Sequence, residues 1–461
     1  MTSSGTIQQR PFSWRFTTPL YLASVLNPVN SSLIATALVP IAHGIGVSIG
    51  QTATLVTALY LASAVAQPTA GKAAEVFGPR RVLIAGIVAV AAGGLVGAVA
   101  HDLLTLVISR VLIGLGTSCA YPTAMLLIRE RAREAGLDEP PGLVLGGLQI
   151  AGVATASLGL PAGGLLVSAF GWRAVFLVNL PVALITLVAT LAWIQADGPR
   201  EWRGLRDVAA RLDLIGILGF AAAMLALLVF LFQLPTAHWW ILAISIALWI
   251  LDVLWELRAA SPFLDVRLLA ARPALTNTYV LFGLVMLCQY VVLYGVTQWI
   301  EAVRGYSESA SGLLLLPMTL VSGIVIALVS RRNMVRGPVI AAAVTALAGS
   351  AGVLLLDSSV WIGTVAILTF LFGASTGFAV AGYQTALYTH APPEQLGTAS
   401  GLLRTFGYVG SIASSAITGM VFHHQVSDHG IHLIAWIMIG ISLGLTVLTL
   451  ADRTLRTRHH P

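Results

Sequence analysis

Long apolar runs alternate with short polar segments along the whole 461-residue chain. A helix needs about 20 apolar residues to cross the hydrocarbon core of a bilayer. By this measure the sequence predicts fourteen membrane-spanning helices, at residues 17–41, 50–70, 82–100, 103–128, 143–168, 174–194, 214–234, 239–257, 274–299, 310–330, 338–356, 360–388, 400–422 and 431–451. We therefore expect an all-α polytopic membrane protein.

The basic residues test this count, because lysine and arginine are enriched in cytosolic loops. With the N-terminus in the cytosol, every basic residue lies on the cytosolic side except Arg173 and Arg304, in outer loops, and Arg110, within a span. Omitting one span would reverse the side of every later loop and destroy this pattern. We therefore predict an even number of spans and cytosolic N- and C-termini.

Two charged segments, at 195–213 and 256–273, divide the chain. They predict a cytosolic N-terminus (1–16), a six-helix bundle (17–194), a linker with two additional transmembrane helices (195–273), a second six-helix bundle (274–451) and a cytosolic tail (452–461). Transporters are often built from two pseudo-symmetric halves with the substrate site between them near the midplane. We expect the same arrangement here.

Composition agrees with a membrane protein and limits its partners. Hydrophobic residues make up 57% of the chain and charged residues 10%, whereas roughly a quarter of a soluble domain is charged. The net charge of +6 comes from dispersed arginines, so no nucleic-acid partner is expected. Cys119 and Cys288 fall in predicted spans and are expected to be packing residues. The histidine-rich loop 423–432 lacks a recognised ligand spacing, so we expect neither a metal nor a cofactor.

Polar side chains in the first span need an explanation, because an unpaired amide is costly in hydrocarbon. Asn27, Asn30 and Ser31 share one helix face through their i, i+3, i+4 spacing. Hydrogen bonds to a neighbouring helix are one explanation, and a water-filled cavity is the other.

Arg110 lies about 10 Å inside the outer edge of the fourth span. A charge at this depth is expensive unless it meets a cavity or a partner. The spans of the two bundles contain no acidic residue near mid-membrane. We therefore predict that Arg110 and Asn30 project into a water-accessible crevice and that Arg110 pairs with an anionic substrate. A purely structural arginine is the alternative.

Other polar and aromatic residues recur at helical spacing in the spans. Such surfaces suit amphipathic organic molecules, although tyrosine and glutamine also bridge helices. The candidates for a substrate or coupling site are Tyr60, Ser63, Gln67, Gln149, Gln289, Tyr290, Tyr294, Gln298, Thr376, Tyr383 and Gln384.

Two glycine-containing segments stand out. In "GKAAEVFGPRRVLIAG", residues 71–86, Gly71 and Gly78 permit close helix approach, and Glu75 can pair with Arg80 or Arg81 or lie at a helix N-terminus. The fifth span contains small residues every fourth position, which form a face that another helix can approach closely. Its motif comprises Gly159, Pro161, Gly163 and Gly164.

The segment 71–86 resembles the signature cytoplasmic loop of the major facilitator superfamily, with Glu75 in place of the usual Asp and Val76 where a basic residue is common. That loop is implied to act as a latch between two halves. The stretch 109–122 is similar to the family's arginine motif, and the fifth span is similar to that of proton-driven exporters. Residues 172–182, 261–276 and 392–411 resemble the fourteen-span drug/proton antiporter branch, in which Asn30 would be an Asp.

The resemblance implies a transporter rather than an enzyme. We expect an efflux pump for small amphipathic organic molecules in the bacterial cell membrane, working as a monomer by alternating access. Proton coupling is implied by the family, although Asn30 cannot titrate. Uptake or facilitated diffusion of an organic anion, with Arg110 as counter-charge, is the first alternative. A membrane receptor without flux is the second.

Overall fold

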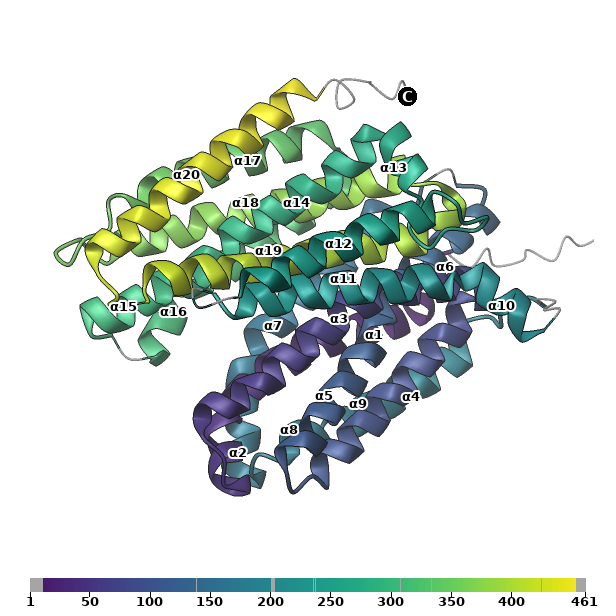
Figure 1. Ribbon diagram of the computed structural model, residues 1–461, viewed down its shortest axis with the longest axis horizontal. Helices are drawn as coiled ribbons and strands as arrows, with labels where there is room; N and C mark the ends of the chain where they lie inside the picture. Colours follow the sequence, from purple (N-terminus) through teal and green to yellow (C-terminus); the bar gives the residue numbers. More distant parts are fainter. Residues whose placement is uncertain are drawn as a thin grey trace, which may run out of the picture.

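The computed structural model describes residues 11–137, 139–199, 204–234, 236, 238–306, 308–332, 334–423 and 425–452. Within these ranges all regular secondary structure is helical (Figure 1). Most of the N-terminal segment 1–16 and nearly all of the tail 452–461 lie outside the described residues. Their expected cytosolic location stays a prediction.

The N-terminal half forms the lower group of helices in Figure 1. It contains α1 (Trp14–Leu33), α2 (Leu38–Ile45), α3 (Ile49–Phe77), α4 (Pro79–Ala98), α5 (Leu103–Ser118), α6 (Ala120–Glu134), α7 (Gly142–Phe170), α8 (Ala174–Leu177) and α9 (Asn179–Trp193). α5 and α6 form one apolar segment, and the first span bends by 61° between α1 and α2.

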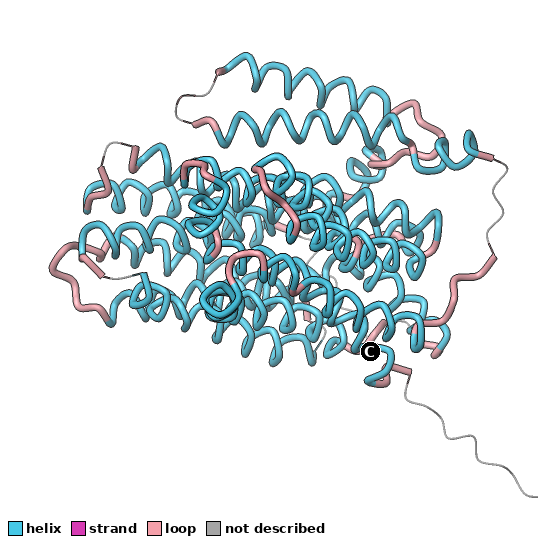
Figure 2. The backbone as a smooth tube through the Cα atoms, turned by 90° about the horizontal axis from the view of Figure 1, so that it is seen from below, coloured by secondary structure: helices cyan, strands magenta, loops and turns pink. Residues whose placement is uncertain are grey.

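The linker contains α10 (Leu205–Leu212), α11 (Leu214–Phe232), α12 (Trp239–Glu256) and α13 (Val266–Ala271). The hairpin α11–α12 lies on the outside of the molecule (Figure 2). It packs against α3 of the N-terminal half and α19 of the C-terminal half.

The C-terminal half forms the upper group in Figure 1. It contains α14 (Pro273–Val291), a π-helical turn (Val292–Val296), α15 (Thr297–Arg304), α16 (Glu308–Val329), α17 (Arg336–Val353), α18 (Gly363–His390), α19 (Leu396–Val421) and α20 (Asp428–Ala451). Short 3-10 turns lie at Ser330–Arg332 and Pro393–Gln395.

Ten helical segments of the described chain are long and apolar enough to cross a membrane, or eleven with the bent first span. α3, α7 and α19 are long helices outside this set, so the count of fourteen spans stays a prediction. We call the end of the bundle with the turns near residues 78, 135 and 330–332 the basic end, because Arg80, Arg81, Arg131 and Arg331 lie there. Its assignment to the cytosol also stays a prediction.

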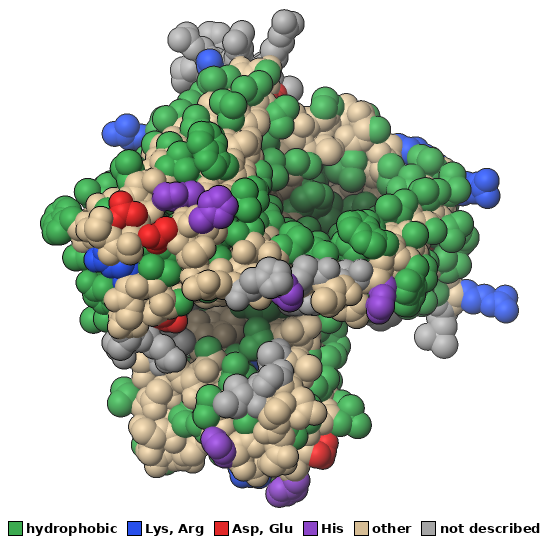
Figure 3. All heavy atoms as spheres, turned by 60° about the vertical axis from the view of Figure 1, so that its left-hand side comes forward, with side chains coloured by type: hydrophobic (Ala, Val, Ile, Leu, Met, Phe, Trp, Pro, Cys, Tyr) green, Lys and Arg blue, Asp and Glu red, His purple; other side chains and the backbone are tan. Residues whose placement is uncertain are grey.

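In the described part of the chain, the hydrophobic core that joins the two halves lies at the basic end. One cluster there contains residues of both halves, such as Leu83 and Leu126 with Leu396 and Leu402. At the opposite end each half has its own cluster. One is confined to residues 33–176 and the other to residues 287–438. Figure 3, which looks toward the opposite end, shows the surface recessed between the lower and upper parts of the molecule.

Buried carboxylates hold the linker hairpin together at the basic end. Asp213 accepts hydrogen bonds from the Trp255 indole (2.8 Å) and the Phe263 amide (3.1 Å), and Glu256 accepts one from the Leu264 amide (3.1 Å). The Lys72 ammonium of α3 donates to the Pro262 carbonyl (2.8 Å). The segment that follows α12 is thereby tied both to its own hairpin and to the N-terminal half.

Candidate functional site

Helices α3 and α19 bring the two halves into backbone contact at the basic end. A methyl group on Gly71 would collide with the Gly397 carbonyl, and one on Gly401 would collide with the Gln67 carbonyl. The Thr405 hydroxyl donates to the Ala64 carbonyl at 2.7 Å. Glycine is required here because any side chain would hold the two helices apart.

Glu75 extends this contact as a polar bridge. Its carboxylate accepts hydrogen bonds from the Thr398 amide (2.7 Å) and the Thr398 hydroxyl (3.1 Å). Because Thr398 lies in the first turn of α19, the negative charge faces a helix N-terminus, where it is favoured. This is the second of the two roles considered for Glu75 from the sequence.

Arg80 and Arg81, the basic pair of the loop 71–86, form hydrogen bonds inside the N-terminal part of the chain. The amides of Arg80 and Arg81, at the start of α4, donate to the Asp197 carboxylate at 3.1 and 2.8 Å. The side chain of Arg80 donates to the Leu191 carbonyl at 3.2 Å. These contacts lie within the N-terminal half and its connection to the linker, whereas Glu75 reaches the other half.

A second layer of cross-half contacts lies deeper, around Arg404 of α19. The guanidinium Nη2 donates to the Gln149 amide oxygen of α7 at 2.7 Å, and the guanidinium lies 4.1 Å from the centre of the Tyr121 ring. The Gln149 amide group in turn donates to the Gln384 oxygen of α18 and to the Tyr121 hydroxyl. One charged group and several neutral polar groups thus connect four helices, α6 and α7 of the N-terminal half with α18 and α19 of the C-terminal half.

An aromatic layer follows toward the opposite end. The rings of Tyr60 in α3 and Tyr408 in α19 lie 5.9 Å apart, and the Tyr408 hydroxyl donates to the Asn27 side-chain oxygen at 3.0 Å. The rings of Tyr290 and Tyr294 lie 5.7 Å apart. All five side chains are partly exposed. They form a polar and aromatic surface where the two halves begin to separate.

Arg110 and Asn30 do not line this surface. Both are only 1% exposed. The guanidinium of Arg110 donates to the Leu55 carbonyl (3.1 Å) and the Asn30 carbonyl (3.2 Å). The expected projection into a water-filled crevice is therefore absent in this conformation, because carbonyl groups of the same bundle satisfy the cation. A part for these residues in binding or coupling stays a prediction.

The amide of Asn30 forms a reciprocal pair with Asn179 of α9. Asn30 donates to the Asn179 oxygen at 2.6 Å, and Asn179 donates to the Asn30 oxygen at 3.1 Å. Asn27, by contrast, donates to Ser63 and Thr117 of the same bundle and accepts from the other half. On the polar face of the first span, Asn30 is therefore paired inside the N-terminal half, whereas Asn27 lies at the interface between the halves. Ser31 donates to the Asn27 carbonyl.

The remaining candidates separate into interface and interior. Gln67 and Gln384 are buried at the contact between the halves, whereas Tyr383 packs against Phe282 inside the C-terminal half. Gln289 accepts a hydrogen bond from Thr376 within that half. Gln298 is exposed. The π turn at Val292–Val296 changes the helical register between Tyr294 and Gln298, so the four-residue repeat does not keep them on one face.

The small-residue face of α7 lies against α1. Methyl groups on Gly159 and Gly163 would collide with Ser32 and Thr36, respectively, whereas Gly164 has open space around it and Pro161 is exposed. The helix that approaches this face is therefore a neighbour in the same bundle.

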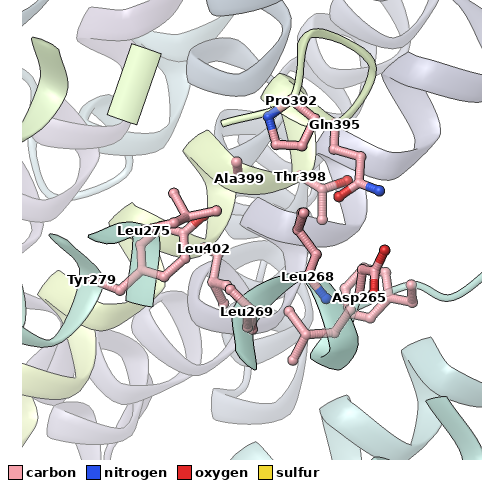
Figure 4. A pocket seen from close by; sticks show the side chains of 12 residues that line it. Asp265, Leu268, Leu269, Leu275, Tyr279, Pro392, Gln395, Thr398, Ala399 and Leu402 are labelled. Carbon is pink, nitrogen blue, oxygen red and sulfur yellow. Dashed lines mark hydrogen bonds between the residues drawn. The ribbon is translucent and has the colours of Figure 1, made fainter. Parts of the chain in front are cut away.

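A small cavity lies where the linker meets α19 (Figure 4). Its volume is about 20 Å³, and Leu264, Leu268, Tyr279, Thr398 and Leu402 are among its lining residues. This is about the space of one water molecule, so it cannot hold an organic substrate. Among the described residues no group of three or more His, Cys, Asp or Glu side chains could hold a metal ion.

Sequence reasoning assigned Arg404 only to the basic loops and missed its place between the halves. The available signal was its position inside the predicted span 400–422, where a charge needs a partner or a cavity. Its partners could not be named from the sequence, because Gln149 is 255 positions away along the chain.

Comparisons with known proteins agree with this architecture. The family model described as Major Facilitator Superfamily matches residues 20–415. The MFS-type transporter YwoD of Bacillus subtilis is 32% identical over 441 residues, which cover 94% of this chain and 96% of the relative. The tetracenomycin C resistance and export protein of Streptomyces glaucescens is 29% identical over 440 residues, covering 93% of this chain and 79% of that protein.

Among solved structures, the human organic anion transporter MFSD10 (TETRAN) matches with a TM-score of 0.65 and 16% identity, covering 94% of this chain and 99% of that one. At this identity the likeness shows the fold alone. The family match covers most of the chain. The chain therefore belongs to the Major Facilitator Superfamily and is a multi-pass membrane transporter.

Proposed function

We propose that this transporter exports small amphipathic organic molecules by alternating access. The observation that carries the proposal is the asymmetry of the core, which joins the halves at the basic end and leaves them separate at the opposite end. With the basic end in the cytosol, this conformation faces outward. The reverse conformation requires the contacts of α3 and α19 to separate.

The chemistry of those contacts supports a reversible gate. Among the described residues they include glycine backbone contacts, the neutral hydrogen bond from Thr405 to Ala64 and the carboxylate bridge from Glu75 to Thr398. Each such hydrogen bond contributes only about 0.5–3 kcal/mol net, depending on whether a charge takes part. The latch role that the resemblance implies for the loop 71–86 is consistent with the Glu75 bridge.

Export rather than import is proposed from the relatives, whose names include a tetracenomycin C resistance and export protein and a puromycin resistance protein. The partly exposed Tyr60, Tyr290, Tyr294 and Tyr408 suit aromatic, amphipathic molecules. A monomer with fourteen spans in the bacterial cell membrane, driven by protons, completes the proposal.

Transport by everted membrane vesicles tests the export proposal. Vesicles from cells that produce the protein should accumulate aromatic dyes and antibiotics when a proton gradient is imposed, and an uncoupler should abolish the accumulation. Vesicles with a Glu75→Ala/Arg404→Ala variant provide the control for dye binding to lipid. Equal flux in both directions without effect of the uncoupler would indicate facilitated diffusion, and binding without flux would indicate a receptor. Either result would contradict the proposal.

A further inference from the structure

Arg404 is a membrane-embedded cation whose partners belong to the other half of the protein. It lies six residues after Thr398 and four before Tyr408, so it is about 9 Å deeper than the Glu75 bridge and about 6 Å from the aromatic layer. The side chain is partly buried.

The groups that contact Arg404 are electrically neutral. They are the amide oxygen of Gln149 at 2.7 Å and the ring of Tyr121 at 4.1 Å. The ion pairs found in the described part of the chain are Arg131–Glu134 and Arg211–Asp207, both far from this site in the sequence. Arg404 therefore has no carboxylate partner among the described residues.

Opening of the basic end would remove these partners. Gln149 and Tyr121 belong to the N-terminal half, whereas Arg404 belongs to the C-terminal half. Separation of the halves breaks both contacts and leaves a guanidinium without a counter-ion at membrane depth. Such a group is costly unless water or an anion meets it. A guanidinium also binds a carboxylate through two parallel hydrogen bonds, which an amide oxygen cannot provide.

Arg110 differs in this respect. Its acceptors, the carbonyls of Leu55 and Asn30, lie in its own half and move with it. Rocking of the halves leaves that arrangement intact. Of Arg110 and Arg404, it is Arg404 that loses its partners when the gate opens.

We propose that Arg404 binds the anionic group of a carboxylate-bearing amphipathic substrate in the inward-open conformation, while the tyrosines of the aromatic layer contact the apolar part. The substrate carboxylate takes the place of Gln149. When the basic end closes again, Gln149 competes for the guanidinium and favours release of the substrate toward the opposite end. This inference rests on the proposed export function and specifies its substrate class.

The test compares pyrenebutyrate with its neutral amide, pyrenebutyramide, in binding to the purified full-length protein in nanodiscs. Wild-type protein should bind the carboxylate more tightly than the amide. Arg404→Gln should weaken pyrenebutyrate binding at least about tenfold, since truncation of one member of a buried charge pair costs several kcal/mol. Its affinity for the amide should change less than about twofold, and Arg404→Lys should recover part of the loss. Arg331→Gln, an exposed arginine at the same end, is the matched control.

A second variant keeps the test independent of folding defects. Gln149→Glu gives Arg404 a permanent carboxylate partner, so it should lower the affinity for pyrenebutyrate and not for the amide. A wild-type protein without preference for the carboxylate, or equal losses for both probes in Arg404→Gln, would overturn the inference. Charge-selective binding without any flux of either probe would contradict the export function and leave the role of Arg404 standing. Export of both probes at the same rate would leave the export function standing and contradict the role of Arg404.

Discussion

The contacts between the two halves of this transporter differ from one end of the molecule to the other. At the basic end the halves share one apolar core and touch through glycine backbones, the Glu75–Thr398 bridge and the Arg404 layer. At the opposite end each half closes its own core. At the basic end the halves therefore meet through apolar packing, glycine contacts and polar bridges, whereas at the opposite end the core clusters stay within each half.

The two membrane-embedded arginines illustrate the same difference. Arg110 is 1% exposed and donates to carbonyls of its own bundle, so it belongs to the permanent structure. Arg404 is partly exposed and donates to an amide of the other bundle, so its partner changes with conformation. Arg110 lies nearer the opposite end and Arg404 nearer the basic end. The location of the partner separates the two roles.

The largest effect is expected where the halves touch through backbone. Gly71→Leu places a side chain against Gly397, and overpacking of this kind costs about 1–3 kcal/mol or more. We expect transport to fall below roughly a tenth of the wild-type rate, since a few kcal/mol shift a two-state equilibrium by tenfold or more. Gly164→Leu in α7 faces open space and should transport normally. Full activity of Gly71→Leu would show that the basic end need not close.

A smaller effect is expected for the polar bridge. Glu75→Gln keeps one acceptor for Thr398 and loses the charge at the N-terminus of α19, worth about 0.3–1 kcal/mol. The population with an open basic end should rise about two- to fivefold. Spin labels at Arg81 and Arg332, both exposed and in different halves, report this population. Glu394→Gln alters an exposed carboxylate near the same helix and should leave the distances unchanged. An identical shift in both variants would contradict a specific bridge.

A change inside one half should affect stability and spare the gate. Asn30→Asp removes the donor to Asn179, which leaves a buried amide oxygen without its partner at a cost of about 1–3 kcal/mol. We expect a lower thermal unfolding midpoint in nanodiscs and an unchanged 81–332 distance distribution. Asn27→Asp, at the interface between the halves, should instead alter the distance distribution. A shift of that distribution in Asn30→Asp would place Asn30 in the gate.

Much of this arrangement follows from local sequence. Apolar length predicts the long helices, and the four-residue spacing of Gly159 and Gly163 predicts a close helix neighbour. Charge preference for a helix N-terminus gives one of two roles for Glu75. These features depend on residues within one segment.

The rest depends on residues that are distant along the chain. The pairing of Asn30 with Asn179 and of Arg404 with Gln149 follows from the packing of helices that the sequence does not order in space. Backbone carbonyls are present in every sequence, so the acceptors of Arg110 could not be recognised from residue types. The lack of an acidic residue in the spans of the two bundles therefore pointed to an anionic substrate as its partner. The π turn at Val292–Val296 rotates the following residues, so regular helical spacing wrongly places Tyr294 and Gln298 on one face.

Cross-linking of the basic end tests the central claim most directly. In a background without Cys119 and Cys288, the pair Glu75→Cys and Thr398→Cys places one thiol on each half at the bridge. A short reducible thiol cross-linker should stop transport, and reduction should restore the rate of the unlinked variant. A cross-linked protein that transports at the unlinked rate would contradict alternating access through this end.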